Sequence, residues 1–208
     1  MLIAYLIERV RPRLFLPLAA IVAVAAAGGT WAGTSTFASD ATLALMLLVQ
    51  FRIWDDLADR HADAAAHPHR VLVRAASTRP LVAFCLALAA ANLFAATLRA
   101  SPWIPTSALA GLNGLMAAYY ARPRPRTAAR DHLLLAKYPL MVLVIAGSRV
   151  ATGAARVLPA MATVYLAACL HEAWHDPASP AAGHRALVAS EAILLAALTI
   201  ALSIGGPS

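Results

Sequence analysis

The sequence predicts an all-α membrane protein, a polytopic bundle of about seven transmembrane helices. Of its 208 residues, 61% are hydrophobic and 13% are charged, and the mean hydropathy is +0.69. Soluble domains carry roughly 25% charged residues, and one soluble core of this size could not bury so much apolar surface. The apolar excess comes from Ala, Leu and Val rather than aromatic residues, which favours helices over lipid-facing barrel strands.

Long apolar runs mark the predicted spans. Three runs are free of charged residues and approach the roughly 20 residues needed to cross a bilayer. They are 14–34, 80–98 and 100–121. Four more runs are apolar but interrupted by ionisable residues: 41–54, 133–148, 157–174 and 186–204.

The first ten residues are too short to span a membrane. They end beside Glu8 and Arg9, so segment 1–10 is expected to form a helix at the membrane interface. The chain shows no linker and no internal repeat, and 1–208 is therefore predicted to form one transmembrane domain.

Basic residues predict the orientation. With a cytoplasmic N-terminus, 13 of the 17 Lys and Arg residues fall in cytoplasmic segments, as the positive-inside rule requires. The net charge is +7, and the basic residues that give it lie beside the predicted spans. Anionic lipid headgroups are therefore the expected partners, and nucleic acid is not. The high content of Ala and Arg is typical of a GC-rich bacterial gene. The expected location is therefore a bacterial inner membrane, with the N-terminus and the active-site loops cytoplasmic. Cys85 and Cys169 lie inside apolar runs and are interpreted as small core residues.

The strongest functional signal follows the second predicted span. Four aspartates lie there within nine residues: Asp55, Asp56, Asp59 and Asp63. If the span continues as a helix, these spacings place the carboxylates on nearly one face within about two turns. Like charges at such spacings repel one another, and a divalent cation is the simplest compensation. Clustered carboxylates suit Mg²⁺, which commonly bridges them to phosphate oxygens.

Basic residues surround the acidic cluster. Arg52, Arg60, His67, His69 and Arg70 could hold an anionic diphosphate. The alternative is a solvated loop in which Arg60 and Arg70 neutralise the aspartates. The position of the aspartates at the end of a span favours the functional interpretation, because ionisable residues at such positions commonly mark functional sites.

These motifs resemble a known family. The segment from Asp55 to Asp63 resembles the first aspartate-rich motif of the UbiA-type intramembrane prenyltransferases, which normally begins with Asn. The segment from His67 to Arg70 is similar to the basic stretch that follows that motif. Tyr119-Tyr120, ahead of a run of arginines, looks like the family's tyrosine-containing region. Glu172 and Asp176 stand where its second acidic motif would lie.

The resemblance implies a helical bundle around a lipid-accessible chamber and a Mg²⁺-dependent enzyme. The expected activity is transfer of a prenyl group from an isoprenoid diphosphate to a lipophilic or aromatic acceptor, or its cyclisation. The residues that it places at the site are catalytic Asp56, Asp59 and Asp63, further metal ligands Asp55, Glu172 and Asp176, and diphosphate contacts Arg70, Tyr120, Arg124 and Lys137. The chain departs from the family in its reduced second motif and in having about seven spans instead of about nine.

Two alternatives come from other functional classes. His171-Glu172-Ala173-Trp174-His175 satisfies His-Glu-x-x-His, in which the two histidines bind Zn²⁺ and the glutamate is a general base. An intramembrane zinc metalloprotease is the first alternative, although it leaves the four aspartates unexplained. The second alternative is a non-catalytic membrane scaffold whose acidic residues cap helices. An oligomer is compatible with each of these functions.

Polar residues within the predicted spans are expected to face other helices, and Lys137, Asn92 and Asn113 are three of them. Lys137 interrupts the fifth span and should face the bundle interior or extend to the membrane surface. Asn92 and Asn113 lie deep in their spans and are expected to form hydrogen bonds between helices.

Overall fold

The computed structural model describes residues 1–121, 127–175, 183, 185, 186, 188–191, 193, 194 and 197. Within these residues the chain is helical and contains no strand, which confirms the all-α prediction. In chain order the helices are α1 (Leu2–Arg9), α2 (Pro12–Ala26), α3 (Thr34–Ala58), α4 (Arg60–Ala66), α5 (Val71–Arg74), α6 (Arg79–Thr97), α7 (Trp103–Tyr120), α8 (Ala128–Leu135), α9 (Lys137–Ala146) and α10 (Arg149–His175).

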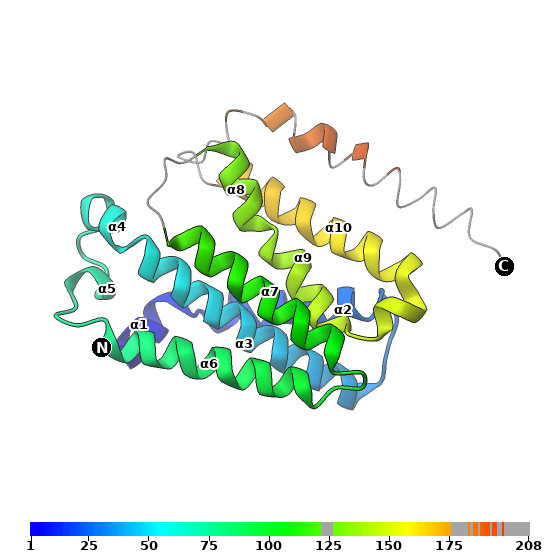
Figure 1. Cartoon of the computed structure of the whole chain (residues 1–208). Helices are drawn as coiled ribbons and strands as arrows, with labels where there is room; N and C mark the ends of the chain where they lie inside the picture. Colours follow the sequence, from blue (N-terminus) through cyan, green and yellow to red (C-terminus); the bar gives the residue numbers. More distant parts are fainter. Residues whose placement is uncertain are drawn as a thin grey trace.

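The long helices form a bundle around α3. This helix packs against α2, α6 and α9, while α7 packs against α6 and α9, and α10 packs against α2 and α9 (Figure 1). Leu43, Leu47 and Phe51 of α3 are almost fully buried and join apolar residues of α2, α7 and α9 in one core. The short helices α4 and α5 lie beyond the end of α3, next to α1.

In the part of the chain that the structure describes, three helices are long and apolar enough to cross a membrane, namely α3, α6 and residues Arg149–Trp174 of α10. The apolar helix α2 has 15 residues. Its length of about 22 Å is shorter than the roughly 30 Å hydrocarbon core of a bilayer. The fifth predicted span is divided at Ala136 between α8 and α9. Most of the seventh predicted span lies outside the described residues. The three helices of spanning length are compatible with an integral membrane protein, and the count of seven spans stays a prediction.

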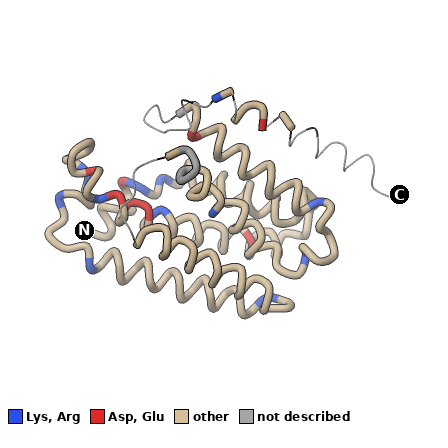
Figure 2. Tube along the Cα trace, turned by 45° about the horizontal axis from the view of Figure 1, so that its top comes forward, with Lys and Arg blue, Asp and Glu red and all other residues tan. Residues whose placement is uncertain are grey.

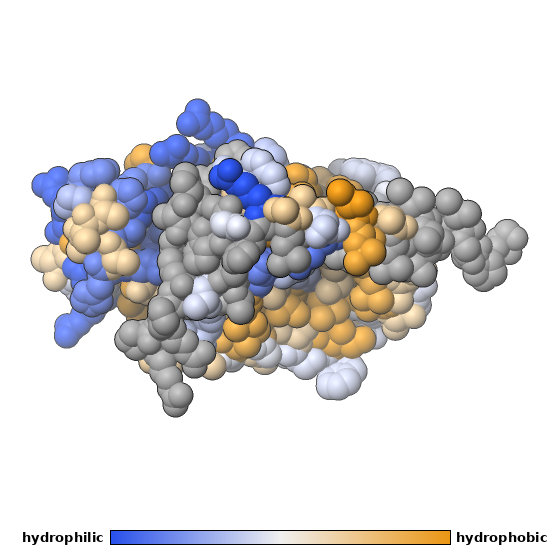
Figure 3. Space-filling model, turned by 90° about the horizontal axis from the view of Figure 1, so that it is seen from above, coloured by the Kyte–Doolittle hydropathy of each residue, from blue (hydrophilic) through white to orange (hydrophobic). Residues whose placement is uncertain are grey.

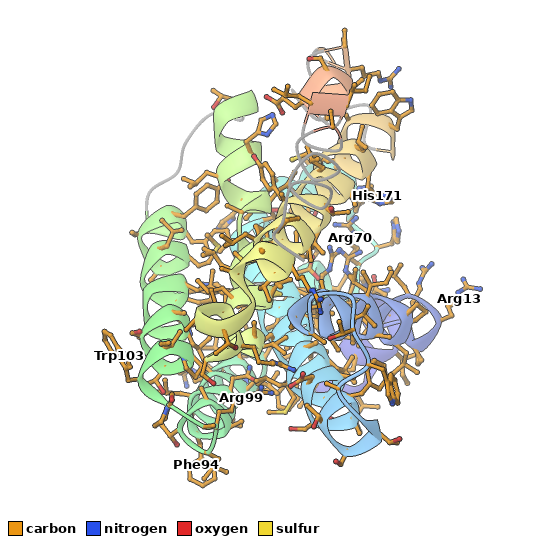
Figure 4. All side chains as sticks on the ribbon, turned by 90° about the vertical axis from the view of Figure 1, so that its right-hand side faces the viewer. Arg13, Arg70, Phe94, Arg99, Trp103 and His171 are labelled. Carbon is orange, nitrogen blue, oxygen red and sulfur yellow. The ribbon has the colours of Figure 1, made fainter. Side chains whose placement is uncertain are left out.

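The outer surface of the bundle exposes large apolar side chains. Leu86 and Phe94 of α6 are each 65% exposed, and Trp103 of α7 is 74% exposed. Phe94 and Trp103 point outward, while Arg99 between them points back into the bundle (Figure 4). Hydrophilic residues gather at the end that carries α4 and α5, and hydrophobic residues are exposed along the middle (Figure 3). Exposed apolar area on this scale is typical of a surface that faces lipid or a partner.

A buried polar network joins three helices in the bundle interior. The Gln50 side-chain amide of α3 donates to Asn113 Oδ1 of α7 at 2.6 Å and accepts from Asn92 Nδ2 of α6 at 2.8 Å. The expected interhelical hydrogen bonds of Asn92 and Asn113 are therefore confirmed. Cys85 and Cys169 are buried and free, as predicted for core residues.

The N-terminal segment forms the amphipathic helix α1. Tyr5 on one face is fully buried, whereas Ile3 and Ile7 on the opposite face are 74% and 75% exposed. The helix is present as expected, and its position at a membrane surface stays a prediction.

Candidate functional site

Charged residues gather where α3 ends, close to the N-terminus of the chain (Figure 2). We call this group the charged mouth. It consists of Arg9, Arg52, Asp55, Asp56, Asp63, Arg70 and Lys137. These residues come from α1, α3, α4 and α9 and from the residue that precedes α5.

The aspartates do not lie along one continuous helix. α3 ends at Ala58 and α4 begins at Arg60, with Asp59 at the bend between them. The prediction of one helical face through Asp63 is therefore wrong, although the Asp63 amide still donates to the Asp59 carbonyl at 2.8 Å. The bend carries Asp63 onto a separate short helix, while the side chain of Asp59 is exposed.

Asp56 turns toward α1. Its carboxylate accepts bonds from Tyr5 Oη at 2.7 Å and from Arg9 Nε and Nη2, both at 2.8 Å. Arg52 Nη2 lies 3.1 Å from the same carboxylate. Burial, followed by the neighbouring Asp56 carboxylate, raises the pKa of the Tyr5 phenol, so this group remains a hydrogen-bond donor. Asp56 is 5% exposed, and these donors supply the partners that a buried carboxylate requires.

Asp55 faces α7 and α9 instead of α1. The Tyr120 phenol at the end of α7 and the Lys137 ammonium at the start of α9 both donate to it. Lys137 is 3% exposed, so of the two expectations for this residue the interior placement holds. The structure thus brings together Asp55, Tyr120 and Lys137, three residues that the sequence placed at one site.

Asp63 and Arg70 form an ion pair across the loop between α4 and α5. This is one of the pairs that the solvated-loop alternative expects. Arg60 behaves differently, since it donates to the carbonyl oxygens of Leu72 at 3.2 Å and Ala75 at 2.8 Å. Arg60 therefore holds α5 and the residue that follows it, while Arg70, directly before α5, pairs with Asp63.

The carboxylates are of the donor type that Mg²⁺ prefers, but their oxygens already have partners. Asp55, Asp56 and Asp63 each bind a basic side chain of the same chain. Among the described residues, no group of three or more His, Cys, Asp or Glu side chains is placed to hold a metal ion. As arranged here, the residues do not fit a Mg²⁺ site.

The predicted second motif is described in part. Glu172 lies near the end of α10 and is partly exposed, and His171 beside it is exposed. Asp176 and the predicted diphosphate contact Arg124 lie outside the described residues. His175 ends α10, and the position of its side chain is likewise not described.

Sequence reasoning missed the contribution of α1. Arg9 reaches Asp56 across 47 residues of sequence, and Tyr5 reaches it across 51. The spacing of Tyr5 and Arg9 was a usable signal, because residues at i and i+4 share one helix face.

A second buried charge cluster was also missed. Asp40 of α3 is 2% exposed and accepts from Arg99 Nη2 and Arg149 Nη2, both at 2.7 Å. Both arginines also donate to the carbonyl of Ile145 near the end of α9. An aspartate near the start of a long apolar helix was the available signal, since such a residue needs a partner.

Comparisons with known proteins leave the family open: no family model, curated protein or solved structure matches the chain.

Proposed function

We propose that the chain is an integral membrane enzyme of the prenyltransferase type, which binds the diphosphate of an isoprenoid at the charged mouth and transfers or cyclises the prenyl group. One observation carries the proposal. Basic side chains from α1 and α9 meet two adjacent aspartates, Asp55 and Asp56, at the end of an apolar bundle. An amphiphile with an anionic head and an apolar tail matches this combination of surfaces.

The chemistry of the substrate explains why such a site needs basic groups. Cleavage of an allylic diphosphate leaves negative charge on the diphosphate, and fixed cations stabilise that charge away from bulk water. Lys137 with Tyr120, and Arg70 at the edge of the loop, are the proposed contacts, and Arg124 stays a predicted one. The prenyl tail would lie among the apolar helices, next to a lipophilic or aromatic acceptor.

The proposed topology has seven spans, with the N-terminus and the charged mouth on the cytoplasmic side of a bacterial inner membrane. The three long apolar helices support the membrane location. A role for Mg²⁺, with Asp55, Asp56, Asp59, Asp63, Glu172 and Asp176 as ligands, would require the paired aspartates to give up their present partners.

Diphosphate release tests the proposal. The purified protein in detergent is supplied with prenyl diphosphates of several chain lengths and with added lipid extract, in Mg²⁺ and in EDTA. Asp59→Ala/Asp63→Ala is the inactive variant, and Arg11→Ala/Arg13→Ala is a control that removes two exposed charges elsewhere. Release by the wild type and the control, abolished in the aspartate variant, supports the enzyme. No release at any chain length would reject it.

A non-catalytic scaffold is the second candidate, because every aspartate of the charged mouth has a basic partner within the chain. The same assay separates the two functions, since a scaffold releases no diphosphate. Zinc content tests the protease: tightly bound zinc that is lost in His171→Ala would favour it over both.

A further inference from the structure

The helix α1 covers the Asp56 side of the charged mouth and is held there by three polar side chains. Arg9 donates twice to Asp56 at 2.8 Å, and Tyr5 donates to the same carboxylate at 2.7 Å. Glu8 Oε2 accepts a bond from the Val71 amide at 2.9 Å, which ties α1 to the start of α5. Two of these three polar attachments end on Asp56. The helix also packs through the buried ring of Tyr5 against Ile53 and Leu72, so Asp56 is the main polar anchor of α1 beside this apolar contact.

A small pocket lies beneath α1, with room for about one water molecule. It is lined by polar residues of α1 and of the charged mouth: Tyr5, Glu8, Arg9, Asp56, Asp63 and Arg70. A diphosphate group is several times larger than a water molecule. It therefore does not fit into this pocket between Arg9 and Arg70 while α1 keeps this position.

The ion pairs beneath α1 are not balanced one to one. Asp56 is shared by the guanidinium groups of Arg9 and Arg52, so one negative charge faces two positive charges. Arg70 is held by Asp63. Arginine binds phosphate oxygens in a bidentate manner, and a diphosphate carries more negative charge than a single carboxylate. A diphosphate is therefore a strong competitor of Asp56 for Arg9.

We propose that α1 is a lid over the Asp56 side of the charged mouth and that a diphosphate group opens it by drawing Arg9 away from Asp56. The identity of the ligand as a prenyl diphosphate rests on the proposed function, and the phosphate of an anionic lipid is the other source of the same chemistry. The released helix has a surface to occupy. Ile3 and Ile7 already form an exposed apolar face, which suits the boundary between headgroups and hydrocarbon.

Hydrogen–deuterium exchange of the backbone amides of α1 tests the lid. The full chain is placed in nanodiscs of zwitterionic lipid without added phosphate. Arg9→Gln should raise the exchange rate of α1 by about tenfold or more, because it removes a charge-assisted bidentate bond. Arg9→Lys, which keeps the charge but not the bidentate geometry, should give a smaller increase. Unchanged exchange in α3 and α6 shows that each variant is folded.

Arg13→Gln is the matched control. Arg13 is exposed and points away from the bundle (Figure 4). It carries the same charge in the same part of the chain, so its removal should leave the exchange of α1 unchanged. Equal exchange in Arg9→Gln and in the wild type would overturn the lid.

Three ligands distinguish the source of the phosphate. Inorganic pyrophosphate and farnesyl diphosphate should raise the exchange of α1 in the wild type, and farnesol, which has the tail alone, should not. A rise on changing to phosphatidylglycerol nanodiscs, without pyrophosphate or farnesyl diphosphate having an effect, would identify a lipid headgroup and reject the prenyl source. No rise with any phosphate compound, or a fall, would overturn the lid.

The proposal that α1 is a lid and the proposal that the chain is an enzyme can be rejected separately. Diphosphate release by a protein whose α1 stays protected in every condition would reject the lid and leave the proposed function intact. An α1 that opens with pyrophosphate in a protein that releases no diphosphate would support the lid and reject the enzyme.

Discussion

The pairing of Lys137 with Asp55 is an example of how single residues are constrained in this bundle. A charge that leaves water loses several kcal/mol of solvation, and a partner at hydrogen-bond distance recovers much of it. Lys137 is 3% exposed and finds its partners in Asp55 and in the ring of Tyr138, which lies 5.5 Å from the ammonium. Removal of one member of such a pair therefore lowers the free energy of unfolding more than removal of both members.

We expect Lys137→Met to destabilise the protein by about 3 kcal/mol, because the Asp55 carboxylate is left without its cation. The double variant Asp55→Asn/Lys137→Met should recover at least half of that loss. Unfolding in mixed detergent micelles measures the unfolding free energy of the double variant and of Lys137→Met and Asp55→Asn alone. If the loss in the double variant equals the sum of the losses in the two single variants, the two groups do not form a coupled pair.

Tyr5 gives the protein a predicted dependence on alkaline pH. Burial raises the pKa of this phenol in the folded protein above the value of about 10 in the unfolded chain. The bond to Asp56 therefore contributes fully below pH 10 and is lost as the pH rises further. The free energy of unfolding should fall more steeply above pH 10 in the wild type than in Tyr5→Phe, as measured by unfolding at a series of pH values. Identical slopes would show that the phenol titrates normally.

At the scale of helices, the sequence predicted much of the bundle and part of the site. The apolar run 41–54 predicted the core of α3, and the depth of Asn92 and Asn113 predicted their interhelical bonds. The bend at Asp59 was not predicted, because periodicity carries a helix forward until a strong breaker interrupts it.

Apart from the pair of Asp63 and Arg70, the partners of the aspartates could not be derived from the sequence. Spacing determines which residues share a face of one helix, but it does not determine which helices meet. Arg9 and Asp56 are brought together by the packing of α1 beside α5, and Asp55 and Lys137 by the packing of α3 beside α9.

The cluster at Asp40 makes a prediction about how helices are joined. Asp40 of α3 holds Arg99, which follows α6, and Arg149, which begins α10, and both arginines also bind the end of α9. Asp40→Asn leaves two guanidinium groups against one neutral side chain, so we expect a loss of about 3 kcal/mol or more in unfolding free energy.

Exchange measurements would locate that effect. Amides at the end of α9 and the start of α10 should exchange faster in Asp40→Asn, while those of α1, at the other end of the bundle, should not change. A uniform increase along the whole chain would mean that the cluster stabilises the bundle as a unit instead of joining these four segments.

The whole molecule has charge clusters at its two ends and exposed apolar side chains between them, and this arrangement makes its orientation testable. The buried Cys85 and Cys169 should not react, so single engineered cysteines can report which side is exposed. His69→Cys lies in the loop before α5, and Ala100→Cys lies between α6 and α7, both at exposed positions. Because α6 has 19 residues and is apolar enough to span a bilayer, its two ends should face opposite compartments.

A membrane-impermeant maleimide added to intact cells should therefore label Ala100→Cys. His69→Cys should be labelled only after the cells are permeabilised. The physical reason is the excess of arginines on the His69 side, which the positive-inside rule assigns to the cytoplasm. The reverse labelling would place the charged mouth outside the cell, where it could not meet a prenyl diphosphate supplied from the cytoplasm. Labelling of both positions from one side would show that α6 does not cross the membrane, and the bundle would then have to lie on the surface.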